Sequence, residues 1–242
     1  MKKISVDMVI SGASFYGLSM LINTKKNVLL IERGARIGDE FLASLAVNCY
    51  EKNPTSEFGK KFLDKLLRDG YIKDGFVCSA PAAFLLAEEA KGKNVMFKTE
   101  ISKITKTDGE YIITVFNSDG YSEIRTPIII DTNPEGVFHT EESEKFLNVM
   151  CESETENSVY DIFTQKYIMS FKAKKGEELY RTCGRLMEYL KEKDIGAVYI
   201  ADAYSYKTEK RKIDDGYYHI PSSCFGNIID AVDSGGYGYD GI

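Results

Sequence analysis

The chain has 242 residues, 43% of them hydrophobic and 28% charged, and its formal net charge is −6 at pH 7. This balance is ordinary for a globular protein, and it argues against a general nucleic-acid binder, because phosphate contacts need a positive surface. No run of about 18 apolar residues occurs, so we expect no transmembrane helix and no membrane partner. The expected location is the cytoplasm.

The cysteines and histidines give no sign of a metal site. The five cysteines contain no C-x-x-C pair, and an odd number suits free thiols in a reducing compartment. The two histidines, His139 and His219, do not neighbour a cysteine in the sequence. We therefore expect no bound metal, since a zinc site needs several such ligands together.

The most informative segment is residues 6–32, VDMVISGASFYGLSMLINTKKNVLLIE. It reads as an apolar strand, a glycine turn, a short apolar helix, and a second strand that ends in an acid. Gly12 permits a sharp turn, Gly17 permits close packing of the helix on the sheet, and Glu32 follows Gly12 by 20 residues, where a carboxylate accepts hydrogen bonds from a ribose. The helix N-terminus then directs its N–H groups at a pyrophosphate.

This βαβ unit predicts a nucleotide site, and the alternative is an α/β core whose glycines only make a turn. Ser14 departs from the usual pattern, which has glycine at that position, and its hydroxyl would either donate to a phosphate or obstruct one. The residues of the turn that we expect to contact the cofactor are Gly12, Ala13, Ser14, Phe15, Tyr16 and Gly17.

The loop that follows Glu32 reads RGARIGDEF. Arg33 and Arg36 place two cations beside the expected ribose and phosphates, and an exposed polar turn is the alternative interpretation. Beyond this loop, the spacing of apolar residues predicts helices over 40–50, 56–69 and 80–91.

From residue 94 to 131 the pattern changes to alternation. Asp-Gly pairs at 108–109 and 119–120 separate the alternating runs, which predicts a three-stranded antiparallel meander. Residues 128–131 (IIID) read as a buried parallel strand that returns to the main sheet. The remaining elements are predicted as a loop or chain crossing over 139–158, a strand over 160–173, a helix over 177–193, a strand over 197–206 and a short helix after Gly226.

Taken in order, these elements resemble the FAD-binding domain of FAD-dependent oxidoreductases with a glutathione-reductase-type dinucleotide fold. The matching pieces are Gly12, Gly17, Glu32, the RGARIGDEF loop, the EISKI strand and IIIDT at 128–132. The resemblance implies the α/β class, with a parallel Rossmann-like sheet, a three-stranded antiparallel meander and a small α+β cap region. It implies an FAD-binding domain over 1–136 plus about 207–242, and a small substrate or cap region over about 137–206.

The same resemblance implies roles for individual residues in binding FAD. The Gly12–Gly17 turn would meet the pyrophosphate, and Glu32 would meet the adenosine ribose. The backbone at Ile101 would lie against the adenine edge. Asp131 and Thr132 would end the strand that lines the cofactor.

The C-terminal third holds the candidates for chemistry at the flavin. By the resemblance, Gly226 and Asn227 would begin a late helix whose N-terminus faces the flavin ring, where its dipole stabilises negative charge. His219, in YYHIPSS just before that helix, is the candidate catalytic proton relay, because histidine titrates near neutral pH. An ordinary surface helix and a surface or core histidine are the alternative interpretations.

Three functional hypotheses follow. The first is an FAD-dependent oxidoreductase that acts on a small organic substrate. The second is a non-catalytic or degenerate nucleotide-binding accessory subunit, motivated by Ser14 and by Pro134, which replaces the glycine of an A-T-G motif and removes a backbone donor. The third is an NAD-dependent dehydrogenase, against which the meander argues. The tyrosine-rich C-terminal third would suit an interface, which leaves a homo-oligomer or a partner subunit open.

Overall fold

The computed structural model describes residues 2–137 and 143–241. Among these residues, six strands form the central sheet, in the order β16–β17–β10–β2–β3–β6. The strands from β17 to β6 run parallel, and β16 is antiparallel at one edge. The strands span Met8–Ser11 (β2), Val28–Ile31 (β3), Val95–Met96 (β6), Ile129–Asp131 (β10), Arg211–Asp214 (β16) and Tyr217–His219 (β17).

The βαβ unit lies at the middle of this sheet. Every residue of β2 and β3 is buried, because the sheet is covered on both faces, and this explains why both strands are continuous apolar runs. Helix α1 (Phe15–Asn23) connects them and is buried from Phe15 to Leu21. A helix buried on nearly all sides carries apolar residues all round, as α1 does.

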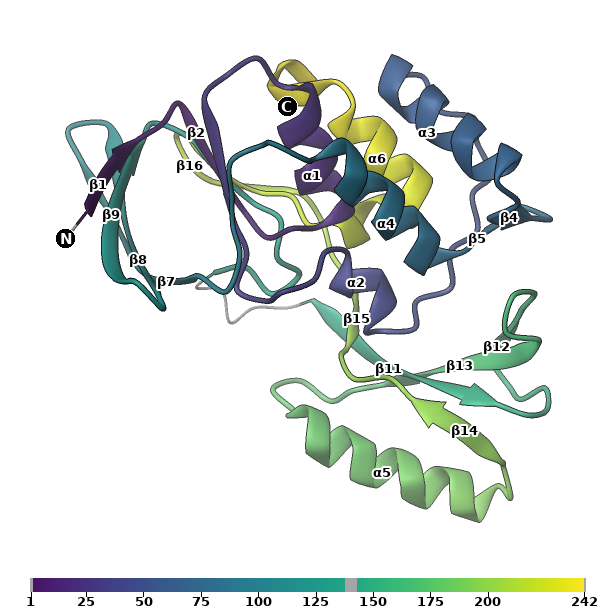
Figure 1. The fold of residues 1–242 in the computed structure, drawn as a ribbon. Helices are drawn as coiled ribbons and strands as arrows, with labels where there is room; N and C mark the ends of the chain where they lie inside the picture. Colours follow the sequence, from purple (N-terminus) through teal and green to yellow (C-terminus); the bar gives the residue numbers. More distant parts are fainter. Residues whose placement is uncertain (1, 138–142, 242) are drawn as a thin grey trace.

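Helices cover one face of the central sheet (Figure 1). Helix α6 comes from the far end of the chain and packs against α1, where the Ser19 hydroxyl donates to the Val232 carbonyl oxygen at 2.6 Å. A side chain is excluded at this crossing, since a Cβ on Gly235 would lie 2.6 Å from the Tyr16 carbonyl oxygen. The other helices of this layer pack around the α1–α6 pair. Besides α1, the layer contains α3 (Glu57–Arg68), α4 (Ser79–Glu89) and α6 (Ile228–Gly235).

A second sheet, in the order β1–β9–β8–β7, covers the opposite face. Its inner side chains, Ile113, Val115 and Ile124, pack against Val9 and Ile129 of the central sheet. Strands β7, β8 and β9 are antiparallel neighbours, and the N-terminal strand β1 adds to β9 in parallel. The strands span Lys2–Ser5 (β1), Glu100–Thr107 (β7), Glu110–Asn117 (β8) and Gly120–Thr126 (β9).

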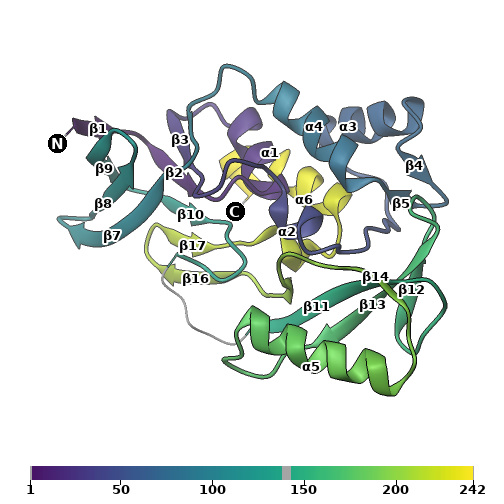
Figure 2. The same ribbon diagram turned by 60° about the horizontal axis from the view of Figure 1, so that its bottom comes forward.

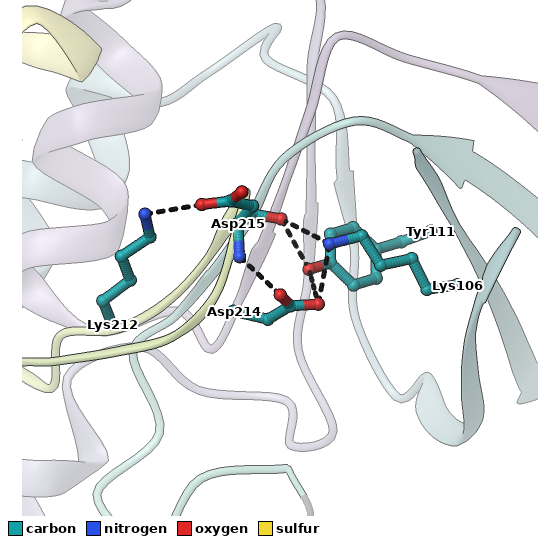
Figure 3. A network of polar contacts seen from close by, with 5 residues as sticks. All are labelled: Lys106, Tyr111, Lys212, Asp214 and Asp215. Atoms are coloured by element: carbon teal, nitrogen blue, oxygen red, sulfur yellow. Dashed lines mark hydrogen bonds and ion pairs between the residues drawn. The ribbon is translucent and has the colours of Figure 1, made fainter. Parts of the chain in front are cut away.

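A polar network fastens this second sheet to the β16–β17 turn (Figure 3). The Lys106 ammonium donates to Asp214 Oδ2 at 2.7 Å and to the Asp215 carbonyl oxygen at 3.0 Å. The Tyr111 hydroxyl donates to the same two oxygens at 3.1 and 2.8 Å. Lys212 pairs with the Asp215 carboxylate at 2.6 Å. The edge of the central sheet is therefore held in place from outside its own strands.

Residues 144–207 form a separate sheet with one helix packed on it (Figure 2). Strand β11 lies at its centre, between β13 and β14, and β15 pairs with the other end of β11. Leu147 and Val149 of β11 pack against Leu186 and Leu190 of α5, which gives this part its own small core. The elements span Glu144–Cys151 (β11), Ser158–Asp161 (β12), Lys166–Lys172 (β13), Leu179–Glu192 (α5), Ala197–Ile200 (β14) and Ser205–Lys207 (β15). We call these residues the cap.

A short helix, α2 (Asp39–Leu42), follows β3, and the residues just after it form hydrogen bonds with the cap. The Ala43 carbonyl oxygen, just after this helix, accepts hydrogen bonds from the amides of Asp202 and Ala203 at 3.0 and 3.2 Å. Asn148 of β11 donates to the Ser44 carbonyl oxygen at 2.7 Å. The remaining short elements are β4 (Ile72–Lys73), β5 (Phe76–Val77) and the 3₁₀ helices at Ser222–Phe225 (η1) and Gly238–Gly241 (η2).

The structure differs from the sequence-based expectation in four segments. The single strand predicted over 197–206 is divided into β14 and β15, which pair with opposite ends of β11. The helix predicted over 40–50 ends at Leu42, and Leu45 has a left-handed backbone conformation with φ of +51°. The single strand predicted over 160–173 is interrupted by a turn at 162–165, so that its two parts pair as β12 and β13. The loop predicted over 139–158 contains β11, the central strand of the cap, while 139–142 lie outside the described residues.

Two general features bear on function. Within residues 2–137 and 143–241, none of the helices combines the length and the apolar character needed to cross a bilayer. In the same part of the chain, no cluster of three or more histidine, cysteine or acidic side chains is arranged to hold a metal ion. The predicted α/β class, with a parallel central sheet, is confirmed.

Candidate functional site

The carboxyl ends of β2, β3 and β10 meet at one edge of the central sheet. The chain leaves β2 and builds β3 on one side of it, whereas β10 lies on the other side. Such a reversal of strand order opens a crevice at the carboxyl edge, where α/β proteins bind ligands. A cavity of about 330 Å³ lies here. It is lined by Ser11, Ile31, Arg33, Asp39, Glu40, Thr99, Glu100, Ile101, Asn133, Pro134, Glu135, Gly136, Val137, Ala203, Tyr204 and Tyr206.

The turn at Gly12 follows Ser11, which lines the cavity, whereas the predicted site residues 12–17 are not among the described lining residues. The φ of Gly12, +101°, is strained for any residue with a side chain, and a Cβ would lie 2.8 Å from Thr132 Oγ1. That hydroxyl lies 2.9 Å from the carbonyl oxygens of both Ser11 and Gly12. The predicted site residues Gly12 and Thr132 are thus brought together, and the glycine lets the end of β10 approach the turn.

Glu32 and Ser14 bind backbone amides of the same turn. Glu32 Oε2 accepts from the Ala13 amide at 2.6 Å, and its other oxygen accepts from the Gly34 amide. Ser14 is the N-cap of α1, and its hydroxyl oxygen accepts from the Gly17 amide at 3.0 Å. Ser14 therefore supplies the cap that begins this short helix, a role that the sequence pattern did not indicate.

The next amides of α1 also have partners within the protein. The Phe15 amide donates to Glu40 Oε1 at 2.9 Å, and the Tyr16 amide donates to the Ser222 hydroxyl at 2.9 Å. Glu40 comes from α2, and Ser222 comes from η1 near the C-terminus. The first turn of α1 is an anion-binding arrangement, and here a carboxylate holds part of it.

The remaining predicted cofactor residues divide into two groups. Arg33 and Ile101 line the cavity at its β3 side. Arg36 is exposed and pairs with Asp39 at 3.1 Å, outside the cavity lining. Gly226 and Asn227 precede α6, where the Asn227 side chain accepts from the Asp230 amide, and neither is among the described residues that line the cavity.

Asp131 organises the loop that forms the cavity floor. Its buried carboxylate accepts from the amides of Val137 at 2.6 Å and Asn133 at 3.2 Å, and from the Asn133 side-chain amide at 2.9 Å. Burial raises the pKa of Asp131. His219, the predicted proton relay, lies with its Nε2 2.8 Å from the Asn133 carbonyl oxygen and is not among the cavity-lining residues. Its position suits support of this loop.

The cap closes the other end of the cavity with tyrosines. Tyr206 donates to Glu135 Oε1 at 2.8 Å, and Lys145 donates to the same oxygen at 2.5 Å. The Lys145 ammonium also lies 5.5 Å from the ring centre of Tyr204 and 5.6 Å from that of Tyr206. Although burial opposes it, Lys145 and Tyr206 hold the pKa of Glu135 below its usual value. This wall is thus aromatic and carries a fixed carboxylate.

Sequence reasoning missed several residues of this site. The sequence places Glu40 in the RGARIGDEF loop and at the start of a predicted helix, Ser222 only in the segment before a helix, and Tyr206 only in a predicted strand or interface. The acid-rich end of RGARIGDEF was the one available signal for Glu40. Nothing local pointed to Ser222, because its partner, the Tyr16 amide, lies 206 residues away in the sequence.

The donor set of the site fits a diphosphate. Two amides of the turn and helix, those of Ala13 and Phe15, already bind carboxylate oxygens. A phosphate oxygen has the same requirement for N–H donors at a positive helix end. The cavity is within the range of about 300–1,000 Å³ that is usual for ligand sites. Ala13 and Phe15 do not line it, and Glu40, which lines it and accepts from the Phe15 amide, stands between the cavity and α1.

Comparisons with solved structures identify the fold. L-proline dehydrogenase from P. horikoshii matches 97% of this chain and 92% of its own, with a TM-score of 0.63 and 12% identity. A geranylgeranyl bacteriochlorophyll reductase-like protein from Thermoplasma acidophilum matches 97% of this chain and 77% of its own (TM-score 0.60, 12% identity). The p-nitrophenol 4-monooxygenase from Pseudomonas putida matches 90% of this chain and 72% of its own, with a TM-score of 0.59 and 10% identity.

No protein-family model matches the chain, and no curated protein matches it in sequence. The structural likeness extends over nearly the whole chain and at these identities establishes the fold alone. The chain therefore has the FAD-binding oxidoreductase fold.

Proposed function

We propose that this chain is an FAD-dependent oxidoreductase of the glutathione-reductase-type fold that acts on a small organic substrate held beneath the cap. The observation that carries the proposal is the cavity at the carboxyl edge of β2, β3 and β10, which extends from Ser11, next to the Gly12 turn, to the tyrosines of the cap. The match to dehydrogenase, reductase and monooxygenase structures supports FAD as the cofactor.

Different residues of this chain would hold the adenosine, diphosphate and flavin parts of the cofactor. Arg33 and the backbone around Ile101, which line the cavity, would hold the adenosine half, and the Gly12 turn with the first amides of α1 would hold the diphosphate. The loop that Asp131 holds, from Asn133 to Val137, leads from there towards the cap. Bound FAD would supply hydride-transfer chemistry, which protein side chains lack.

The cap residues would hold and orient the substrate. Tyr204 and Tyr206 present aromatic surface to the cavity, and Glu135 presents a carboxylate whose position Lys145 fixes. Together with the loop at Pro134 they would exclude water from the reacting groups, which strengthens polar interactions in the site. This arrangement favours a planar or apolar organic substrate.

The test is the flavin content and redox response of the purified chain. We expect a yellow protein, or a colourless one that takes up added FAD, whose flavin absorbance a chemical reductant bleaches. A chain that takes up no FAD would overturn the proposal. A bound flavin that a reductant cannot bleach would favour an accessory subunit instead.

A pair of arginine variants tests the cofactor's position. Arg33→Ala should weaken FAD binding about tenfold to a hundredfold, because a charge-assisted hydrogen bond to the cofactor contributes roughly 1.5–3 kcal/mol. Arg36→Ala removes an equal charge from the exposed side of the same loop and should leave the affinity almost unchanged. Fluorescence titration with FAD measures both. Equal effects would place the adenosine half elsewhere.

A further inference from the structure

Glu40 occupies the place that the proposed function assigns to a phosphate. Its Oε1 accepts from the Phe15 amide at 2.9 Å, at the N-terminal turn of α1, and the same side chain lines the cavity. No other side chain of the described cavity lining bonds to an amide of that turn. A diphosphate that reached the Phe15 amide would therefore have to replace the Glu40 carboxylate.

The surroundings of Glu40 make its carboxylate a weakly held occupant. The carboxylate has the Phe15 amide of α1 and the Ser222 hydroxyl of η1 as hydrogen-bond partners. The negative charge of Glu32, at the end of β3, opposes the ionisation of Glu40. Among the described residues Glu40 forms no ion pair with a lysine or arginine: Arg36 pairs with Asp39, and Arg33 lines the same cavity without an ion pair to Glu40. A half-buried carboxylate without an ion-pair partner is costly to keep ionised.

We propose, on the basis of the proposed function, that Glu40 is an internal anion that occupies the diphosphate position of α1 and must leave the Phe15 amide before a dinucleotide binds. The empty site is then closed by the protein's own carboxylate. Binding of the cofactor is a competition between two anions for one set of backbone donors.

Displacement of the Glu40 side chain requires a smaller rearrangement than displacement of helix α2. The segment before α2 is held by the Gly38 amide, which donates to the Ala13 carbonyl oxygen at 2.9 Å. The segment after it is held by the Ala43 carbonyl oxygen, which accepts from Asp202 and Ala203 of the cap. With both ends of α2 fixed, rotation of the Glu40 side chain towards the cavity mouth is the smaller rearrangement.

The competition predicts that FAD binding depends on the charge of Glu40. Burial, aided by Glu32, raises the pKa of Glu40 to about 7. If FAD binds best when this carboxyl group is neutral and displaced, the affinity of the wild-type chain should fall about tenfold between pH 6 and pH 8, one pH unit on either side of that pKa. Glu40→Gln keeps the size of the side chain and removes the charge, so its affinity should stay nearly constant over the same range.

The experiment is a fluorescence titration of flavin-free protein with FAD at pH 6, 7 and 8. Three chains are compared: wild type, Glu40→Gln, and Glu57→Gln, a control that removes an exposed glutamate from the first turn of α3. We expect Glu40→Gln to bind FAD about tenfold more tightly than the other two at pH 8 and about equally at pH 6. If a variant does not fold, the pH dependence of FAD binding by the wild-type chain is by itself a test of the competition.

The outcomes separate this inference from the proposed function. If all three chains bind FAD with the same affinity at pH 8, the inference is wrong and the function stands. The same holds if Glu40→Gln binds more weakly, which would make Glu40 a supporting residue. If no chain binds FAD at any pH, both the inference and the proposed function are wrong.

Discussion

Gly12 is the residue on which the geometry of the nucleotide turn depends most directly. It combines a φ of +101° with contact to Thr132 on the end of β10, so that both backbone conformation and space exclude a side chain. Gly70 offers a matched comparison, because its φ is +76° and a Cβ added there would have nothing within 4 Å.

We predict that Gly12→Ala destabilises the chain by about 3 kcal/mol and Gly70→Ala by about 1 kcal/mol, since only the first adds a collision to the cost of the left-handed conformation. Urea unfolding curves of the two variants measure the difference. Equal losses would mean that the approach of Thr132 to the turn is unimportant for stability.

Glu40 should leave a signature in the pH dependence of stability even without a cofactor. Its pKa is raised from an ordinary 4.5 to about 7 in the folded chain, chiefly by burial. Between these values the folded chain binds more protons than the unfolded chain, so stability falls as the pH rises and the loss is complete above about pH 7.

Glu40→Gln lacks this titration. We therefore expect the variant to gain stability relative to wild type as the pH rises from about 5 to 7.5, and then to keep a constant advantage. Urea midpoints at several pH values measure the gap. A gap that shrinks with rising pH would show that the ionised carboxylate is the stabilising form.

The site residues that the sequence identifies most clearly lie within one local βαβ unit, whereas those that it does not identify have hydrogen-bond partners on distant elements. Gly12 and Glu32 have a fixed spacing within one βαβ unit, and local pattern was enough to single them out. Glu40 and Ser222 reach the first turn of α1 from other elements. Only tertiary structure brings them there, and it also shows that Ser14 is a helix cap.

At the scale of elements, the network in Figure 3 is the clearest link between two sheets. The Tyr111 ring is buried against Tyr217, with ring centres 5.9 Å apart, while its hydroxyl binds Asp214 and the Asp215 carbonyl oxygen. The ring thus belongs to the core between the sheets, and the hydroxyl belongs to the network.

Tyr111→Phe separates these two contributions. We predict a loss of about 1 kcal/mol, the usual value for a hydrogen bond whose acceptors stay accessible to other donors. Tyr121→Phe, on the exposed surface of β9, should change stability little. Thermal unfolding of both variants measures this, and a larger loss from Tyr121→Phe would contradict the role given to the network.

The elements that sequence missed share a physical cause. Strand β11 follows an acidic, polar run in the sequence, which hides it. It is recognisable as a central strand only in the structure, where β13 and β14 pair with its two sides. The 160–173 segment is rich in aromatic and β-branched residues and so resembles one strand, but the Gln165 amide donates to the Asp161 carbonyl oxygen at 2.8 Å and closes a turn. Helix 40–50 fails because Ala43 and Ser44 bond to the cap instead.

At the scale of the whole molecule, the cap and the nucleotide turn meet through α2. The helix carries Glu40 at its start, and Ala43 and Ser44, just beyond its end, bond to cap residues. The order of strands predicted the α/β class, because a βαβ unit and a returning strand require a parallel sheet. The position of the cap over the cavity could not be predicted, since it depends on those contacts with α2.

The central claim is that the carboxyl edge of the sheet binds FAD, and calorimetric titration of the flavin-free chain tests it most directly. The titration is made with FAD and separately with NADH, at pH 6 where Glu40 is expected to be mainly neutral. We predict saturable binding of one FAD per chain and much weaker binding of NADH. Binding of NADH in preference to FAD, or no uptake of FAD, would contradict the account.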